Sequence, residues 1–115
     1  MKEDRLYLLH MKECMERIIQ YTKDGRGPFM DSTLIQDAVL RNLQTMAESS
    51  QHLSATLKDE HTEVNWRGSS GFRNVLVHNY LGVELTTVWQ LIETDLPALL
   101  RQIGDLSSKL SEDEE

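Results

Sequence analysis

Apolar residues recur at helical spacing along most of this chain. Between Glu3 and Thr22 they return at alternating intervals of four and three residues, which is the pattern of a helix with one buried face. The stretch from Asp24 to Pro28 predicts the end of this helix, because glycine favours the left-handed cap and proline cannot continue the helix. The stripe consists of Tyr7, Met11, Cys14, Ile18 and Tyr21, widened by Leu8, Met15 and Ile19.

A second apolar stripe predicts a helix of about 25 residues that reaches Leu57. Asp31 is its expected N-cap and Ser32 is the competitor, since either side chain can accept a hydrogen bond from a free backbone N–H. The polar stretch from Lys58 to Asn65 predicts a connection. The stripe consists of Ile35, Val39, Leu43, Met46, Ser50, Leu53 and Leu57.

A third apolar stripe continues through Pro97, where a helix must either bend or start anew. We expect a new helix, because Thr94 and Asp95 are both good N-caps and Pro97 would then stand in its first turn. A shorter helix is predicted around residues 72–78, and Gly82 would end it. The third stripe consists of Val88, Ile92, Leu96, Leu99, Ile103, Leu106 and Leu110.

These helices predict an all-α fold, an antiparallel bundle of four to five helices, with no strand pattern in the chain. The length of 115 residues fits one domain, and we assign residues 1–110 to the bundle. Residues 111–115 form a predicted acidic, disordered tail. So small a bundle exposes much surface, and formation of a homodimer would cover part of it.

The charge of the chain limits what it can bind. The net charge is −7, of which the last four residues supply −4 and the rest of the chain −3. A general nucleic-acid-binding protein would present a basic surface instead. Any RNA site must therefore be a local cationic patch on an acidic body.

The sequence carries no membrane or export signal. No apolar stretch approaches the ~20 residues that span a bilayer, and the first residues lack the apolar core of a signal peptide. Cys14 is the single cysteine, which excludes an internal disulfide. We therefore expect a cytoplasmic protein without membrane association.

Three strongly polar side chains flank the apolar run from Val75 to Val77. They are Arg73, His78 and Tyr80, with the spacing R-x4-H-x-Y. A guanidinium binds phosphate through two hydrogen bonds and neutralises developing charge, while an imidazole transfers protons near neutral pH. These are the groups that cleavage of a phosphodiester without a metal requires.

The geometry of this segment restricts how the two groups can meet. On one helix Arg73 and His78 point about 140° apart, so both cannot reach one phosphate. Asn74 shares a face with His78 and could hold the imidazole in one tautomer. Either the helix ends at His78 and the ring swings round, or two copies of the chain meet across a dimer axis. We favour the dimer.

Further short motifs surround R-x4-H-x-Y in a characteristic order. They are Leu8-Leu9-His10, Phe29, Ala38-Val39-Leu40-Arg41-Asn42-Leu43, Ala47-Glu48, Trp66, Gly71-Phe72-Arg73-Asn74, His78-Asn79-Tyr80-Leu81-Gly82-Val83, Val88-Trp89 and Asp95-Leu96-Pro97. With these flanks the chain resembles the HepT-like HEPN proteins, the toxin half of the HepT/MntA toxin–antitoxin modules. The resemblance extends over nearly the whole chain.

The resemblance implies a homodimeric HEPN bundle that acts as the endoribonuclease toxin of a type VII module, without a metal or another cofactor. Arg73 and His78 would be catalytic, with Asn74 in support. Tyr80 would accept AMP from an MntA-like minimal nucleotidyltransferase antitoxin, which would block RNA; from the sequence alone, this ring could instead pack on the bundle. The alternative is a non-catalytic HEPN module that dimerises and binds a nucleotidyltransferase.

Other chemically active side chains have simpler interpretations. His10 and Cys14 stand four residues apart and could bind a metal, but two ligands make a poor site and we expect packing. Trp66 and Trp89 are expected in the core or an interface rather than as platforms for bases. His52 is expected to face solvent.

Overall fold

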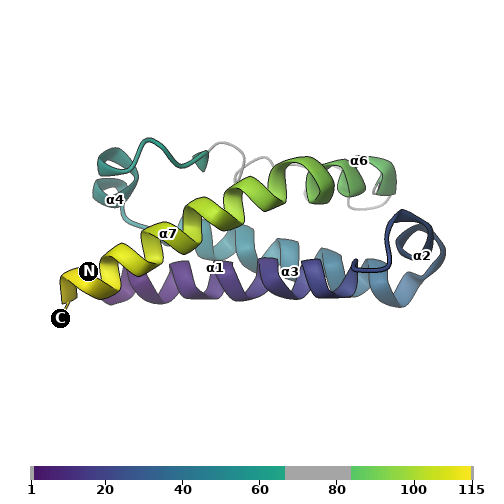
Figure 1. The fold of residues 1–115 in the computed structure, drawn as a ribbon. Helices are drawn as coiled ribbons and strands as arrows, with labels where there is room; N and C mark the ends of the chain where they lie inside the picture. Colours follow the sequence, from purple (N-terminus) through teal and green to yellow (C-terminus); the bar gives the residue numbers. More distant parts are fainter. Residues whose placement is uncertain (1, 67–83, 115) are drawn as a thin grey trace.

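The computed structural model of this chain describes residues 2–66 and 84–114, and all regular secondary structure in these residues is helical, as predicted. The long helix α1 (Lys2–Tyr21) packs against both α3 (Thr33–Gln51) and α7 (Leu96–Glu114) (Figure 1). None of the described helices is long and apolar enough to cross a bilayer. The shorter elements are α2 (Arg26–Asp31), α4 (Ala55–Glu60), α6 (Leu85–Gln90) and the π-helix η1 (Leu91–Asp95).

Helix α1 confirms the first predicted helix. Its core stripe is buried as expected, but Ile19 and Tyr21 are about two-fifths exposed, so the stripe narrows toward the end of the helix. The hydroxyl of Thr22 donates to the carbonyl of Ile18 at 2.7 Å, and Gly25 follows in the left-handed region with φ of 97°. The buried residues of the stripe are Leu8, Met11, Cys14, Met15 and Ile18.

The turn after α1 contains an unexpected helix, α2, which places the side chain of Phe29 in the core. The Gln36 amide group donates to the carbonyl oxygens of Phe29 at 3.0 Å and Met30 at 3.1 Å, which satisfies groups at the end of α2. Because α2 includes Asp31, our prediction of Asp31 as N-cap is wrong. Ser32 is the N-cap of α3, and its hydroxyl accepts from Ile35 N–H at 3.2 Å.

The second apolar stripe is buried from Val39 onward and half-buried at Ile35, but it belongs to two helices instead of one. Helix α3 ends at Gln51, and α4 starts after Ser54 and extends to Glu60, beyond the predicted boundary at Lys58. Ser54 makes the break, because its hydroxyl accepts from Leu57 N–H at 3.1 Å. The buried carboxylate of Asp4 in α1 accepts from the backbone N–H of Ser54 at 2.9 Å and from its hydroxyl at 2.7 Å.

The third stripe lies on one continuous helical segment, from Leu85 in α6 through η1 to Glu114 in α7; it is buried from Val88 to Leu106 and half-buried at Leu110. Our prediction that Thr94 or Asp95 caps a new helix is therefore wrong. The N–H of Leu96 bonds to the carbonyl of Leu91, five residues earlier. This wider turn relieves the clash of Pro97 with the carbonyl four residues before it, and α7 departs in a different direction from α6 (Figure 1). Helix α7 includes residues 111–114, which the sequence analysis assigned to the acidic tail.

Candidate functional site

The four residues that the sequence singles out are in the range 67–83, between the two described parts of the chain. Arg73, Asn74, His78 and Tyr80 therefore lie outside the described residues. Their roles stay predictions. What the structure does describe is how the chain is held on either side of this range.

On the N-terminal side, the chain is attached to α7. The backbone N–H of Asn65 donates to Oε1 of Gln102 at 3.1 Å, and Val64 is buried. The indole N–H of Trp66 donates to the carbonyl of His61 at 3.0 Å, and the ring packs against the core, as expected. The last described residues before the R-x4-H-x-Y motif are thus fixed to the bundle.

On the C-terminal side, the chain is attached to α2 through aromatic packing. Trp89 is half-buried, and its ring lies 5.5 Å from that of Phe29, centroid to centroid. Its indole N–H donates to Oε2 of Glu93 at 3.1 Å, and Val88 beside it is fully buried. Trp89 is therefore a core and interhelical residue, as the sequence indicated.

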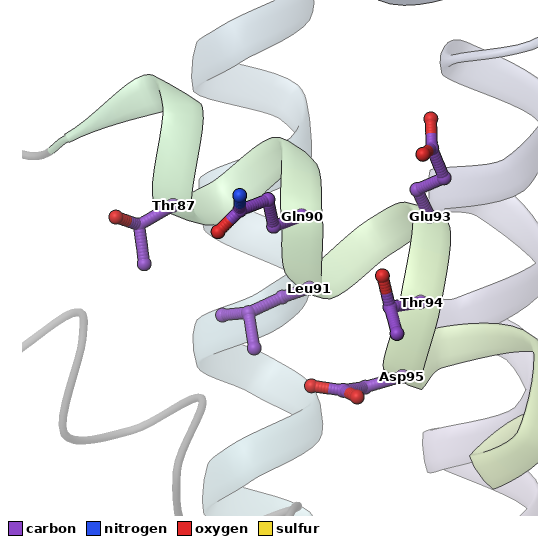
Figure 2. A pocket seen from close by; sticks show the side chains of 6 residues that line it. All are labelled: Thr87, Gln90, Leu91, Glu93, Thr94 and Asp95. Atoms are coloured by element: carbon purple, nitrogen blue, oxygen red, sulfur yellow. The ribbon is translucent and has the colours of Figure 1, made fainter.

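A hollow of about 380 Å³ lies on the exposed side of α6 and η1. Figure 2 shows that the side chains of Gln90, Leu91 and Asp95 extend to one side of the helix, whereas that of Glu93 points away. The hollow was not expected from the sequence, in which Thr94 and Asp95 were predicted as candidates for a helix cap. The described residues that line it are Thr87, Gln90, Leu91, Glu93, Thr94 and Asp95.

The hollow is polar and acidic on its described side. Hydroxyl, amide and carboxylate groups line it, Leu91 adds an apolar surface, and no described lining residue is basic. Carboxylates repel phosphate groups, so these residues fit a ligand that donates hydrogen bonds. In the sequence, positions 87, 90, 91, 94 and 95 have only the spacing of one helix face, which by itself does not distinguish a hollow from any solvated face.

The other candidates from the sequence pack within the bundle. Cys14 is buried, and burial raises the pKa of its thiol. His10 is exposed, and its ring packs edge-on against that of Tyr7, with 6.3 Å between the ring centroids. This contact is one of packing, as expected for His10. Within residues 2–66 and 84–114, no group of three or more metal-binding side chains occurs. His52 is exposed, as expected, but it also stacks on Tyr7 at 4.9 Å.

One exposed ion pair lies near the N-terminal attachment. Nδ1 of His61 is 3.2 Å from Oε1 of Glu63. A hydrogen bond from its own backbone N–H and, more weakly, the His61 ring lower the pKa of the Glu63 carboxyl. Because this carboxylate is fully exposed, solvent screens the pair and we assign it no catalytic role.

Known proteins resemble this chain over most of its length. It is 31% identical over 94 residues to a protein from Thermococcus cleftensis named as a probable ribonuclease HepT, and the match covers 81% of this chain and 86% of the relative. It is 28% identical over 110 residues to a protein from Caldanaerobacter subterraneus subsp. tengcongensis named as a proposed RNase, with coverage of 95% and 98%.

A third relative has a second activity in its name. A protein from Methanocaldococcus jannaschii, named as a gamma-glutamylcyclotransferase and proposed RNase, is 30% identical over 110 residues. This match covers 95% of the chain but 50% of the relative, so the chain spans about half the length of that protein. No solved structure matches the chain significantly. The family model described as Ribonuclease HepT-like matches residues 11–106, and the chain therefore belongs to the HepT-like ribonuclease family.

Proposed function

We propose that this protein is a metal-independent endoribonuclease and the toxin of a type VII HEPN/MNT toxin–antitoxin module, with Arg73 and His78 as its catalytic residues. The observation that carries the proposal is the complete R-x4-H-x-Y motif inside a family match that extends on both sides of it. The names of the relatives, which include a ribonuclease HepT, support the same activity.

The proposed reaction is an internal transesterification of RNA. His78 takes the proton of a ribose 2′-hydroxyl, whose oxygen attacks the adjacent phosphorus. Arg73 stabilises the negative charge on the pentacoordinate phosphorus, and Asn74 orients the imidazole. The bond from phosphorus to the 5′-oxygen breaks, that oxygen is protonated from solvent, and a 2′,3′-cyclic phosphate remains. DNA is not cleaved, because it lacks the 2′-hydroxyl.

We propose that two copies of the chain form the site together. On the helix that we predict for residues 72–78, Arg73 and His78 would point about 140° apart, so one copy could not bring both to one phosphate. In the proposed homodimer, Arg73 of one protomer and His78 of the other flank the same scissile phosphate. The guanidinium then supplies a local positive charge on the acidic body of the chain.

Tyr80 is the proposed control point of the toxin. A cognate MntA-like nucleotidyltransferase transfers AMP from ATP to the phenol: the phenol oxygen loses its proton and bonds to the α-phosphorus, and pyrophosphate leaves. The product carries phosphate charge two residues from His78, where RNA must bind. Repulsion of the RNA backbone then blocks cleavage. If Tyr80→Phe is no longer modified and its toxicity is no longer neutralised by the antitoxin, this role is supported; normal neutralisation contradicts it.

Cleavage in the presence of EDTA tests the activity. The purified protein, Arg73→Ala and His78→Ala are incubated with total RNA, and Arg41→Ala serves as control because Arg41 is an exposed arginine on α3. We expect cleavage by the wild type and by Arg41→Ala only. An oligonucleotide with one 2′-deoxyribose at the scissile position should stay intact, and its cleavage would overturn the mechanism.

A non-catalytic module that dimerises and binds a nucleotidyltransferase is the second candidate, and the net charge of −7 favours it. The two functions differ in their effect on growth. A toxin arrests growth when it is expressed alone, and Arg73→Ala or His78→Ala relieves the arrest. A binding module leaves growth unchanged, whichever of these residues is replaced.

A further inference from the structure

We infer that the hollow on α6 and η1 is a nucleobase subsite, which binds a base that carries an amino group in the RNA substrate. This inference rests on the proposed function and names the part of the RNA that these residues recognise. It concerns the residues that line the hollow, to which neither the motif nor the comparisons assign a role.

The lining of the hollow suits a ligand that donates hydrogen bonds. The Asp95 carboxylate only accepts hydrogen bonds, while the Gln90 amide and the Thr94 hydroxyl can donate or accept. The negative charge of Asp95 disfavours a phosphate as the occupant. Adenine, cytosine and guanine each present an amino group that donates to such acceptors, whereas uracil has no amino group.

The size and surface of the hollow also fit a nucleobase. A volume of about 380 Å³ suits one nucleoside-sized group rather than a protein segment. The half-buried side chain of Leu91 lies among the polar ones (Figure 2) and offers an apolar surface to the face of a base. A ring on Leu91 would thus have its polar edge directed at Gln90 and Asp95.

The backbone at this place is also unusual. Thr94 and Asp95 lie in a π-helical turn, a form that occurs frequently at functional sites. The side chain of Asp95, at the end of this turn, extends to the same side as those of Gln90 and Leu91 (Figure 2).

The hollow also lies close to the motif along the chain. Three residues lie between Tyr80 and Glu84, which precedes the first residue of α6. An extended chain spans at most about 3.6 Å per residue, so the two Cα atoms are within about 14 Å. A few nucleotides of one strand cover such a distance, so one RNA can contact both the motif and the segment that carries the hollow.

The test measures base preference without cleavage. A fluorescein-labelled octamer of 2′-deoxyuridine, which cannot be cleaved, is compared by anisotropy with octamers in which one central base is adenine, cytosine or guanine. We expect the wild-type protein to bind at least one amino-bearing octamer about fivefold or more tightly than the uracil octamer, as one good base contact provides.

Asp95→Asn replaces one hydrogen-bond acceptor by a donor. The affinity ratio between the amino-bearing octamer and the uracil octamer should then fall close to one. Thr94→Val removes a hydroxyl and should lower this ratio less. Asp105→Asn is the matched control, since Asp105 is an exposed aspartate on α7 whose loss changes the net charge equally. Circular dichroism establishes that each variant is folded.

Three results overturn the inference. The first is a wild-type protein without base preference, and the second is a loss of base preference in Asp105→Asn as large as in Asp95→Asn. The third is an arginine-rich peptide whose binding requires Asp95, while every octamer binds the wild type and Asp95→Asn equally well. Cleavage of all-ribose octamers in EDTA is measured in parallel. Cleavage without base preference refutes the nucleobase subsite but supports the proposed ribonuclease activity. Base preference without cleavage supports the subsite but contradicts the ribonuclease activity.

Discussion

The α1–α3 pair and the segment from α6 through η1 bury apolar stripes of the same kind on helices of different regularity. Helix α3 has a serine N-cap, and α1 and α3 pack along their length. Weak helix formers occur in both regions, since α3 contains Asp37, Asn42 and Thr45 as the other segment contains Thr94 and Asp95. The difference is the backbone: α3 is a regular α-helix, whereas the second region includes a π-helical turn just before Pro97.

Loss of the proposed catalytic groups should have the largest effect and leave the scaffold intact. Arg73→Ala and His78→Ala should each lower the cleavage rate by roughly 10²–10⁴-fold, the range for a general acid–base group, with an unchanged melting temperature. A mixture of the two variants, allowed to exchange subunits, should regain activity if each site uses two protomers. Mixing without any recovery would place both residues in one chain.

A substitution in the core should lower stability and leave the catalytic activity of the folded protein unchanged. Leu43 is 1% exposed on α3, and Leu43→Ala should lower the free energy of unfolding by about 2–5 kcal/mol, because it leaves a cavity between the helices. Urea denaturation measures this change. Cleavage per folded molecule should stay the same; a selective loss of activity would show that the α1–α3 pair is more than a scaffold.

The cap of α4 should contribute less. Ser54→Ala removes the hydroxyl that accepts from Leu57 N–H and donates to Asp4, and it should cost about 0.5–2 kcal/mol. Thr56→Ala, at an exposed position of the same helix, is the control and should be nearly neutral. Equal stability of the two variants in urea would contradict the role of Ser54.

Pro97→Ala should have the smallest effect on stability. The π-helical turn already accommodates the proline, so we expect a change within about 1 kcal/mol, toward higher stability, since alanine is the better helix former. The same variant should weaken the base preference, because the turn is then free to become α-helical. A large loss of stability would show that the turn depends on the proline for more than its missing N–H.

The fold was largely predictable from the spacing of apolar residues, and the errors have physical causes. Ile35 to Leu57 keep helical spacing although the helix breaks, because the break depends on Asp4, which is 50 residues from Ser54 in sequence. The cap expected at Thr94 or Asp95 fails because a π-helical turn also accommodates proline. Local sequence patterns predict neither a hydrogen bond between residues far apart in the chain nor whether a proline follows a π-helical turn or a new helix cap.

The candidate site was also predictable only in part. Residue chemistry and the resemblance to the HepT-like family predict Arg73 and His78 as the catalytic residues; the family is confirmed, and the two roles stay predictions. The hollow beside α6 could not be predicted, since Thr87, Gln90 and Asp95 at helical spacing match any solvated helix face. Only the three-dimensional structure shows that this face is concave.

The tie between Asp4 and Ser54 also has a consequence for how the molecule assembles. A helix of six residues is too short to persist by itself, so α4 depends on contacts made by α1. Helix α4 should therefore order only after α1 has docked, late on the folding route. An alteration of the first few residues would loosen α4 and, through it, the chain that leads to Trp66 and the R-x4-H-x-Y motif.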